Sequence, residues 1–576
     1  MSNDTHMSEN FYRAKAYDFS KIPGSPIAYW VSDTVSYAFE HYKPLGWFLD
    51  IKAGMSTTDN QLFLRQWFEI NRTDLQLHFS KENQNCKTEK RWFPYIKGGS
   101  FRRWYGNNDY VVNWKNSGED IKQYIAERPE KQVGGRLVNM EFFFKECLAW
   151  TRISSGSFSA RYYPEGSIFS DASNGGFGKR IYIESILLLL NSKIVTSILK
   201  VISPTLNFYA GDIAKLPAEI NKTNMGLFKE LIKISCTDWD SSETSWDFTT
   251  LPMISSKTNS KLLSEKYSFC RQRWIKSTNE MQSLEEENNQ IIIETYGLQD
   301  ELSPEVPLNE ITLTCNPHFR YGKNKSAHEL ENLLLGDTMK ELISYAVGCM
   351  FGRYSLDKDG LILANIDEGI NEYLEQISEP SFIPDKSGIL PITDENDFTN
   401  DITNQFKVFL KASFCAEKFS ENLRFIEEAI GKDIRSFVLK DFYKDHIKRY
   451  KKRPIYWMIS SPSGAFRALI YLHRYTIDTI SLFLNDYLRP YQRKLEAKVQ
   501  QADQVLISAS SSNSDKTRAQ KNLDKIHKVL NELEVWERDV VYPLATQRIE
   551  LDLDDGVKAN YGKLGSILEK VKGLNA

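Results

Sequence analysis

The sequence lacks the short motifs that mark the commonest classes of enzyme. Its 576 residues contain no P-loop, H-E-x-x-H, G-x-S-x-G or dinucleotide-binding G-x-G-x-x-G pattern. A Pro-Asp followed at suitable distance by [DE]-x-K, as in restriction-type nucleases, is also missing. The seven cysteines form no C-x-x-C pair, and the eight histidines show no metal-ligand spacing. These absences argue against a zinc ribbon or a disulfide framework, and they predict no resident metal and a reducing, cytoplasmic setting.

Long apolar runs and a strong net charge are missing too. The most apolar stretch, residues 186–202, is interrupted by polar residues, so we expect an amphipathic helix over 181–202, ended by Pro204, and no membrane partner. The net charge is only −3, so any binding of nucleic acid must come from local basic patches. No repeat of fixed period is visible.

The length and composition of the chain predict several domains with a mixed α/β (α+β) fold. Residues 1–44 read as a linker, and residues 45–220 alternate short β-like runs with Gly- and Asn-rich turns, which predicts a mixed sheet with long loops. Residues 221–300 read as a helical connector in which the Glu285–Glu287 run is a solvated face. Residues 301–576 read as mainly helical, with a helix over 429–450 and a helical hairpin over 485–540 around a small polar turn.

The segment 86–115 combines basic and aromatic residues. Seven basic and two acidic residues give it a local charge of +5, and eight aromatic residues are interleaved with them. A Gly-Gly turn at 98–99 can bring backbone amides close to a phosphate, and arginine or asparagine side chains can reach phosphates or base edges. The equally open alternative is a sheet with an aromatic core and a solvated basic face. The DNA-contacting candidates here are Lys97, Ser100, Arg102, Arg103, Tyr105 and Asn107.

Two further clusters have the same chemistry. A Ser-rich loop with two arginines suits phosphate contacts, and its candidates are Arg152, Ser155, Ser157 and Arg161. Residues 440–453 also carry a local charge of +5, which suits a DNA backbone, although a cationic helix C-terminus favoured by the helix dipole explains it equally well. The candidates there are Lys448, Arg449, Lys451 and Lys452.

One tetrapeptide is similar to a catalytic motif. Asn316-Pro317-His318-Phe319 resembles the N-P-P-[YF] of amino-methyltransferases, in which Asn and a proline carbonyl accept hydrogens from the base amine. His318 replaces the second proline, and no F-x-G-x-G loop for S-adenosylmethionine occurs in the chain. Because Asn-Pro is a common turn dipeptide, we expect a loop here and no catalytic residues in the chain.

Longer phrases resemble the PglX adenine-specific methyltransferases of BREX phage-defence systems. The resemblance covers nearly all of residues 11–570 and is carried by 22–30, 53–60, 91–114, 153–169, 190–217, 296–302, 311–317, 337–342, 451–457, 471–475 and 551–558. Family members are roughly twice this length and begin with a methyltransferase core, whereas this chain matches the portion C-terminal to that core. By resemblance, residues 45–220 are a DNA target recognition domain, to which Asp59 and Asn60 are added as DNA-facing residues.

The resemblance implies a DNA-specificity portion of an adenine methyltransferase, acting on double-stranded DNA with a separate catalytic half that binds S-adenosylmethionine. No cofactor is expected in this chain itself. Two alternatives stay open: a non-catalytic protein that docks to other BREX components through the hairpin, and a truncated fragment without function.

Overall fold

The computed structural model describes residues 22–25, 27, 30–79, 89–127, 136–154, 156–203, 205–220, 225–255, 260–395 and 397–574. The chain forms two compact units. Unit 1 contains residues 1–65, 74–245 and 271–330, and unit 2 contains residues 66–73, 246–270 and 331–576. Within unit 1 the helices that follow the sheets pack onto them. The domain boundaries expected at residues 220 and 300 stay predictions. The α+β class expected from the sequence is confirmed.

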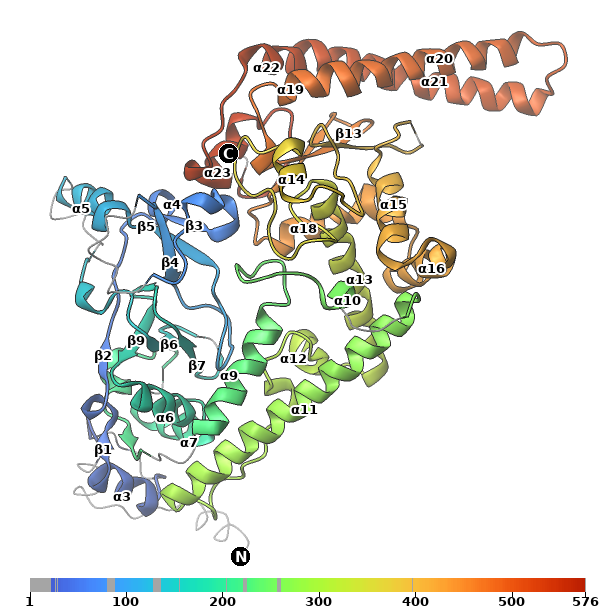
Figure 1. The fold of residues 1–576 in the computed structure, drawn as a ribbon. Coiled ribbons are helices and arrows are strands. Elements are labelled where there is room, and N and C mark those ends of the chain that lie inside the picture. The colour runs from blue at the N-terminus through green and yellow to red at the C-terminus, as the bar shows by residue number, and fades with distance from the viewer. Residues whose placement is uncertain are drawn as a thin grey trace, which may run out of the picture. The chain divides into compact units, whose positions relative to one another are not determined.

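Unit 1 is built on two four-stranded sheets and one strand pair (Figure 1). One sheet has the order β2-β9-β6-β7 and is antiparallel throughout. The other has the order β3-β5-β4-β8, in which β4 pairs antiparallel with β5 and parallel with β8. The strands are β1 (Lys43–Pro44), β2 (Asp50–Lys52), β3 (Leu64–Gln66), β4 (Trp92–Ile96), β5 (Tyr110–Asn113), β6 (Cys147–Thr151), β7 (Ala160–Tyr163), β8 (Ile168–Phe169), β9 (Ser173–Phe177) and β10 (Pro217–Ala218).

Helices cover the sheets of unit 1. They are α3 (Asp33–His41), α4 (Asn60–Phe63), α5 (Glu119–Ala126), α6 (Arg180–Leu190), α7 (Lys193–Ile202), α8 (Ala210–Ile213), α9 (Met225–Trp239), the long α11 (Leu263–Tyr296), whose first residues belong to unit 2, and α12 (Pro317–Tyr321). Phe63 of α4 and Ile121 of α5 belong to a smaller apolar core, and α6, α7, α9 and α11 contribute to a larger one. The leucines of α6 are buried in the larger core, where each contributes about 1.5–3 kcal/mol.

The prediction of a single helix over 181–202 is wrong. The structure breaks it into α6 and α7, which meet at 77°. Asn191 ends α6 because its side chain is used elsewhere: its amide donates to the carbonyl of Ala160 over 3.0 Å, and its oxygen accepts the Ala160 N–H over 2.9 Å. Asn289 of α11 then accepts the N–H of Lys193, the first residue of α7, over 3.0 Å.

Unit 2 is mainly helical around a three-stranded antiparallel sheet of order β11-β13-β12. Its strands are β11 (Ile389–Ile392), β12 (Tyr456–Ser460) and β13 (Arg467–Tyr471), and its helices are α10 (Pro252–Ser255), α13 (Ala327–Met350, which begins in unit 1), α14 (Ile370–Gln376), α15 (Ile402–Phe414), α16 (Phe419–Ile430), α17 (Ile434–Phe437), α18 (Tyr443–Arg449), α19 (Thr479–Leu482), α20 (Arg489–Ile507), α21 (Asn513–Trp536), α22 (Tyr542–Gln547) and α23 (Gly556–Lys563).

The expected helical hairpin is confirmed: α20 and α21 run side by side and are joined by residues 508–512 (Figure 1). The helix expected over 429–450 begins later than predicted. Gly431, in the left-handed conformation at φ +73°, ends α16, and Asp433 caps α17 by accepting the N–H of Ser436. Of the helices described, none is by itself long and apolar enough to cross a membrane. Helices α6 and α7 reach the necessary length and apolar character only together, as a bent pair.

Candidate nucleic-acid interface

Three connecting segments of unit 1 meet where the strands of its sheets begin or end. Residues 97–100 follow β4, residues 152–159 follow β6, and residues 170–172 precede β9. Backbone bonds join them: the Arg152 N–H donates to the Ala172 carbonyl over 2.9 Å, and the Ser170 N–H to the Ile96 carbonyl over 3.0 Å. Residues 205–208 join this group, because the Ser154 N–H donates to the Leu206 carbonyl over 3.0 Å. We call these four segments the loop end of unit 1.

Thr151 clamps the Gly-Gly turn of the loop end. Its hydroxyl accepts the Gly99 N–H over 3.1 Å and lies 3.2 Å from the Gly99 carbonyl oxygen, to which it donates. Gly98 and Gly99 have φ of +79° and +156°, and a Cβ on Gly99 would lie 2.6 Å from the side-chain amide carbon of Asn107. The turn therefore needs glycine at these positions, both for its backbone angles and for the close approach of Asn107.

Arg161 supports Thr151 from inside the sheet. The side chain is fully buried, and its guanidinium donates to the Thr151 hydroxyl over 3.1 Å, to the Tyr163 hydroxyl over 3.0 Å and to the Arg102 carbonyl over 3.2 Å. A buried guanidinium with three such acceptors holds their positions closely, because moving any of them leaves a desolvated N–H without a partner. Arg161 is therefore placed as a positioning residue for the Gly-Gly turn.

Arg102 is bound to the end of α9. It is 3% exposed, and it donates to the carboxylate of Asp238 over 2.8 Å and to the Tyr105 carbonyl over 2.7 Å. Burial by itself would raise the pKa of Asp238, but the Arg102 charge and the N–H donors of Thr314 and Cys315 outweigh it, so this pKa lies below its usual value. Asp238 is thus held as a carboxylate that ties the loop after β4 to residues 314–315.

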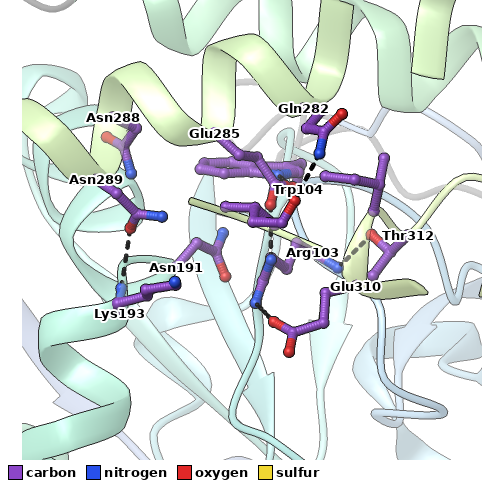
Figure 2. A network of polar contacts seen from close by, with 12 residues as sticks. Arg103, Trp104, Asn191, Lys193, Gln282, Glu285, Asn288, Asn289, Glu310 and Thr312 are labelled. Carbon is purple, nitrogen blue, oxygen red and sulfur yellow. Dashed lines mark hydrogen bonds and ion pairs between the residues drawn. The ribbon is translucent and has the colours of Figure 1, made fainter. Parts of the chain in front are cut away.

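Arg103 and Trp104 are bound to α11 through one carboxylate (Figure 2). The oxygens of Glu285 accept from the Arg103 guanidinium over 2.6 Å and from the Trp104 indole N–H over 2.7 Å. Glu310 adds a second, half-exposed ion pair to Arg103 at 3.2 Å. Burial raises the pKa of Glu285 against the opposing effect of Arg103. The prediction that the Glu285–Glu287 run forms a solvated face is therefore wrong at Glu285, which is 3% exposed.

The structure places the predicted DNA-contacting residues of unit 1 in two groups. Arg102, Arg103 and Arg161 are buried and bonded within the protein, as are Tyr105 and Asn107, whose amide donates to the Ser100 carbonyl over 2.9 Å. Ser100 and Ser157 are exposed at the loop end, and Lys97 and Arg152 are partly exposed there. Ser155 lies outside the described residues. Direct contact of the buried arginines with DNA stays a prediction, and it would require their internal bonds to open.

The partly exposed cations of the loop end, Lys97 and Arg152, share one acidic neighbour. Arg152 pairs with Asp171 at 3.5 Å, with both side chains about a third or more exposed. Burial lowers the pKa of Lys97, and the charge of Asp171 opposes that effect. The Arg152–Asp171 ion pair is weak at this exposure, so a phosphate can replace Asp171 as the partner of Arg152 at little cost.

Asp59 and Asn60 lie at the start of α4. The Asp59 carboxylate caps this helix by accepting the N–H groups of Gln61 and Leu62, and Asn60 is exposed and accepts from the Thr57 hydroxyl over 2.8 Å. Met55, four residues before Asp59, exchanges backbone hydrogen bonds with Phe169 and Asp171. Met55 therefore lies beside the turn that precedes β9, and the DNA-facing role expected for Asp59 and Asn60 stays a prediction.

The basic candidates of unit 2 surround the end of α18. Lys448, Lys451 and Lys452 are exposed, and the last two have positive φ of 51° and 61° in the turn that ends the helix. Arg449 is bound to Asp445 at 2.8 Å and lies 3.7 Å from Glu341. The three lysines thus present charge to solvent, whereas Arg449 supports the helix.

Asn316 does not fit the role of a base-amine acceptor. It is fully buried and caps α12, so the loop expected at this tetrapeptide is a helix N-terminus instead. Its amide donates to the carbonyls of Leu308 and Ile311, and its oxygen accepts the His318 N–H over 3.1 Å. Every polar atom of the side chain is engaged within the protein, so no step of methyl transfer is assigned to it.

Reasoning from the sequence missed the residues that hold the loop end together. Asp238, Glu285 and Thr151 carry no local motif, and the first two lie 136 and 182 residues from the arginines they bind. Among the residues the structure describes, no group of three or more His, Cys, Asp or Glu side chains could hold a metal ion.

Two curated proteins are similar to the chain over nearly its whole length. The adenine-specific methyltransferase PglX of Lacticaseibacillus casei (strain Zhang) is 36% identical over 579 residues, which cover 96% of this chain and 45% of that protein. The adenine-specific methyltransferase BrxX of Escherichia coli O9:H4 (strain HS) is 35% identical over 599 residues, which cover 99% of this chain and 48% of that protein. No protein-family model matches. The chain spans about half the length of these relatives, and the resemblance to PglX-type methyltransferases is confirmed.

Proposed function

We propose that this chain, a PglX-type sequence by its similarity to those methyltransferases, is the DNA-specificity portion of a site-specific adenine methyltransferase of a BREX system. In this proposal it acts with a catalytic half that binds S-adenosylmethionine. The observation that carries the proposal is the loop end, where backbone and side-chain donors of Lys97, Ser100, Arg152 and Ser157 gather at one end of the sheets of unit 1. Such donors are the groups that contact phosphates and base edges.

The buried arginines explain how this surface keeps its shape. Arg161 holds Thr151, which holds the Gly-Gly turn, while Asp238 and Glu285 hold the residues after that turn. Recognition of a DNA sequence needs side chains held within about 0.5 Å of their productive positions, which a buried supporting layer provides. We therefore assign direct DNA contacts to the exposed residues and a positioning role to the buried ones.

Binding to double-stranded DNA tests this surface. The exchange Lys97→Glu with Arg152→Glu should weaken binding of a fluorescent duplex and lower the slope of log K against log salt by about 2, because each phosphate contact contributes about 1. The matched control is Lys229→Glu with Lys233→Glu, two exposed cations of α9, which should leave affinity and slope unchanged. Fluorescence anisotropy at several salt concentrations gives both values.

The cluster at α18 provides the contrasting result. If the loop-end exchange leaves binding intact while Lys448→Glu, Lys451→Glu and Lys452→Glu together abolish it, the main DNA surface belongs to unit 2. Arg449 is left out of that variant because its reversal would break the ion pairs with Asp445 and Glu341. Binding by neither surface would favour a chain that has lost DNA recognition.

A second candidate function is docking to other proteins of the same defence system through the hairpin. It is favoured by a groove along α20 and α21 whose lining includes the apolar side chains of Val505, Ile526 and Val529.

A further inference from the structure

Two of the segments that make up the loop end pair with each other as a short antiparallel ribbon. Ile153 and Asn207 are partners in an isolated antiparallel bridge. On one side of this bridge the Phe208 N–H donates to the Arg152 carbonyl over 2.7 Å, and on the other side a backbone bond of 3.0 Å joins residues 154 and 206. Residues 152–154 and 206–208 are therefore held in one register, and we call them the loop-end ribbon.

The base of the loop-end ribbon is anchored in the core of unit 1. Phe208 is 8% exposed and packs edge-on against Phe158, with the ring centroids 5.0 Å apart. The Phe208 carbonyl accepts the Trp150 indole N–H over 2.9 Å and the Asn174 amide over 3.2 Å. Moving this base would expose an aromatic ring and leave two buried donors unpaired, so the ribbon is held firmly where it leaves the core.

The ribbon projects beyond that core. In an antiparallel pair, side chains alternate between the two faces, and residues directly opposite each other share a face. Leu206 therefore lies on the same face as the buried Phe208, yet it is 58% exposed, so the ribbon runs past the edge of the core. On the opposite face Ile153 is also 58% exposed. The major groove of B-DNA, about 12 Å wide, admits a two-stranded ribbon of this kind.

The face that carries Ile153 and Asn207 combines an aliphatic side chain with an amide. Side chains directly opposite each other have Cβ atoms about 4.5–5.5 Å apart, so these two lie side by side. Of the described residues, none is hydrogen-bonded to the Asn207 side-chain amide, because the Thr205 and Ser203 hydroxyls bond the backbone N–H and carbonyl of Asn207 over 3.2 and 2.8 Å. The amide can therefore offer its donor and its acceptor to a ligand.

We infer that this face of the ribbon reads one A·T base pair in the major groove, with the Asn207 amide on adenine and Ile153 against the thymine methyl group. Adenine presents the N7 acceptor and the N6 donor side by side, which an asparagine amide matches, and thymine of the same pair presents its methyl group. The inference rests on the proposed function, because it names the readers within the surface proposed to bind DNA. Lys97 and Arg152, both partly exposed, supply charge for the flanking phosphates.

A protein partner is disfavoured at the ribbon. Within its described residues the ribbon exposes one aliphatic side chain on each face, Ile153 on one and Leu206 on the other. Protein interaction sites are marked by contiguous apolar patches of several hundred Å², and two side chains on opposite faces form no such patch.

Selection of duplexes from a random library by the full-length chain, followed by sequencing, tests the inference. The unmodified chain should enrich a defined sequence. Asn207→Ala should lose the preference for A·T at one position and keep the others, and Ile153→Ala should weaken the preference at the same position. The matched control is Leu206→Ala, which removes an equally exposed aliphatic side chain from the opposite face and should leave that preference unchanged. Thermal unfolding shows whether each variant is folded.

Single-atom changes in the selected duplex assign each contact to its side chain. Replacing adenine of that pair with 7-deazaadenine removes the N7 acceptor, which should weaken binding by the unmodified chain about fivefold and leave binding by Asn207→Ala unchanged. Replacing thymine with deoxyuridine removes the methyl group, which should weaken binding about fourfold, and by less in Ile153→Ala. Fluorescence anisotropy measures both effects.

The outcomes separate this inference from the proposed function. If the unmodified chain enriches a sequence and both Asn207→Ala and Ile153→Ala keep the preference at every position, the inference is wrong and the proposed function stands. The inference is also wrong if Leu206→Ala, and not Ile153→Ala, changes the preference, because the opposite face would then read the base pair. If the unmodified chain enriches no sequence and binds no duplex, both are wrong.

Discussion

Replacing Asp238 with asparagine should destabilise unit 1 strongly, although the two side chains have nearly the same shape. Asp238 accepts from the Arg102 guanidinium over 2.8 Å, from the Thr314 N–H over 2.8 Å and hydroxyl over 2.9 Å, and from the Cys315 N–H over 3.0 Å. An asparagine NH2 group at either oxygen position would face a donor. The exchange also leaves the guanidinium of Arg102, which is 3% exposed, without a carboxylate.

The magnitude depends on the burial of both partners. Removing one partner of a buried ion pair costs about 3–5 kcal/mol, because the remaining charge is desolvated and unpaired. That is a large share of the roughly 5–15 kcal/mol by which a typical domain is stable. Replacing Arg102 with methionine at the same time removes the orphaned charge, so the double variant should lose less stability than the two single variants together.

Urea unfolding followed by circular dichroism and tryptophan fluorescence measures these differences. Trp239 is a suitable reporter, because its ring lies 4.9 Å from the Arg102 guanidinium. The control is Asp212→Asn on α8, whose ion pair with Lys215 spans 3.6 Å and is partly solvent-exposed, so it should cost under about 1 kcal/mol. The reasoning is refuted if Asp238→Asn costs no more than this control, or if the single losses simply add in the double variant.

Three further predictions concern the turn, the acid stability and the chemistry of the chain. Thr151→Val should lower the free energy of unfolding by about 1–3 kcal/mol and speed amide hydrogen exchange at Gly99, because it leaves the N–H donors of Gly99 and Arg161 unpaired. Thr151→Ser, which keeps the hydroxyl, should restore slow exchange. Burial, and to a smaller extent Arg353, lowers the pKa of His473 to about 3. Because the unfolded histidine binds its proton near pH 6.5, stability should be full above that pH and fall as pH decreases, by about 2 kcal/mol at pH 5. In His473→Gln, whose amide can still donate to the Ile70 carbonyl, the fall in the urea midpoint from pH 7 to 5 should be smaller; an equal fall would contradict the assignment. Finally, the purified chain alone should transfer no radiolabelled methyl group from S-adenosylmethionine to DNA, and measurable transfer would show catalytic residues that we have not identified.

The elements that the sequence predicted best are those determined by local pattern. Two periodic helices around residues 508–512, which are small and polar, predict a hairpin because the signal is contained within the segment itself. The break between α6 and α7 was not predictable in this way. It depends on Asn191 bonding to Ala160 and on Asn289 capping α7, and both partners are distant in the sequence.

The basic segment after β4 shows the same limit at the candidate site. Its composition drew attention to residues 97–108, but composition cannot distinguish a charge that faces solvent from one that is paired inside the protein. Arg102 and Arg103 are buried because Asp238 and Glu285 meet them from α9 and α11. The acidic neighbour of Lys97 and Arg152 is instead Asp171, whose side chain is itself exposed, and this is why these two cations are the better candidates for phosphate contacts.

Adenine methylation by a reconstituted enzyme would show whether this chain selects the DNA site. A catalytic half from one of the similar methyltransferases would be co-expressed with this chain, and N6-methyladenine would be mapped by sequencing of the host DNA. We predict methylation at one defined sequence that requires this chain and is reduced by Lys97→Glu with Arg152→Glu but not by Lys229→Glu with Lys233→Glu. Methylation of the same sequence without this chain would contradict its role in selecting the site. So would a stable complex whose methylation pattern does not respond to the loop-end exchange.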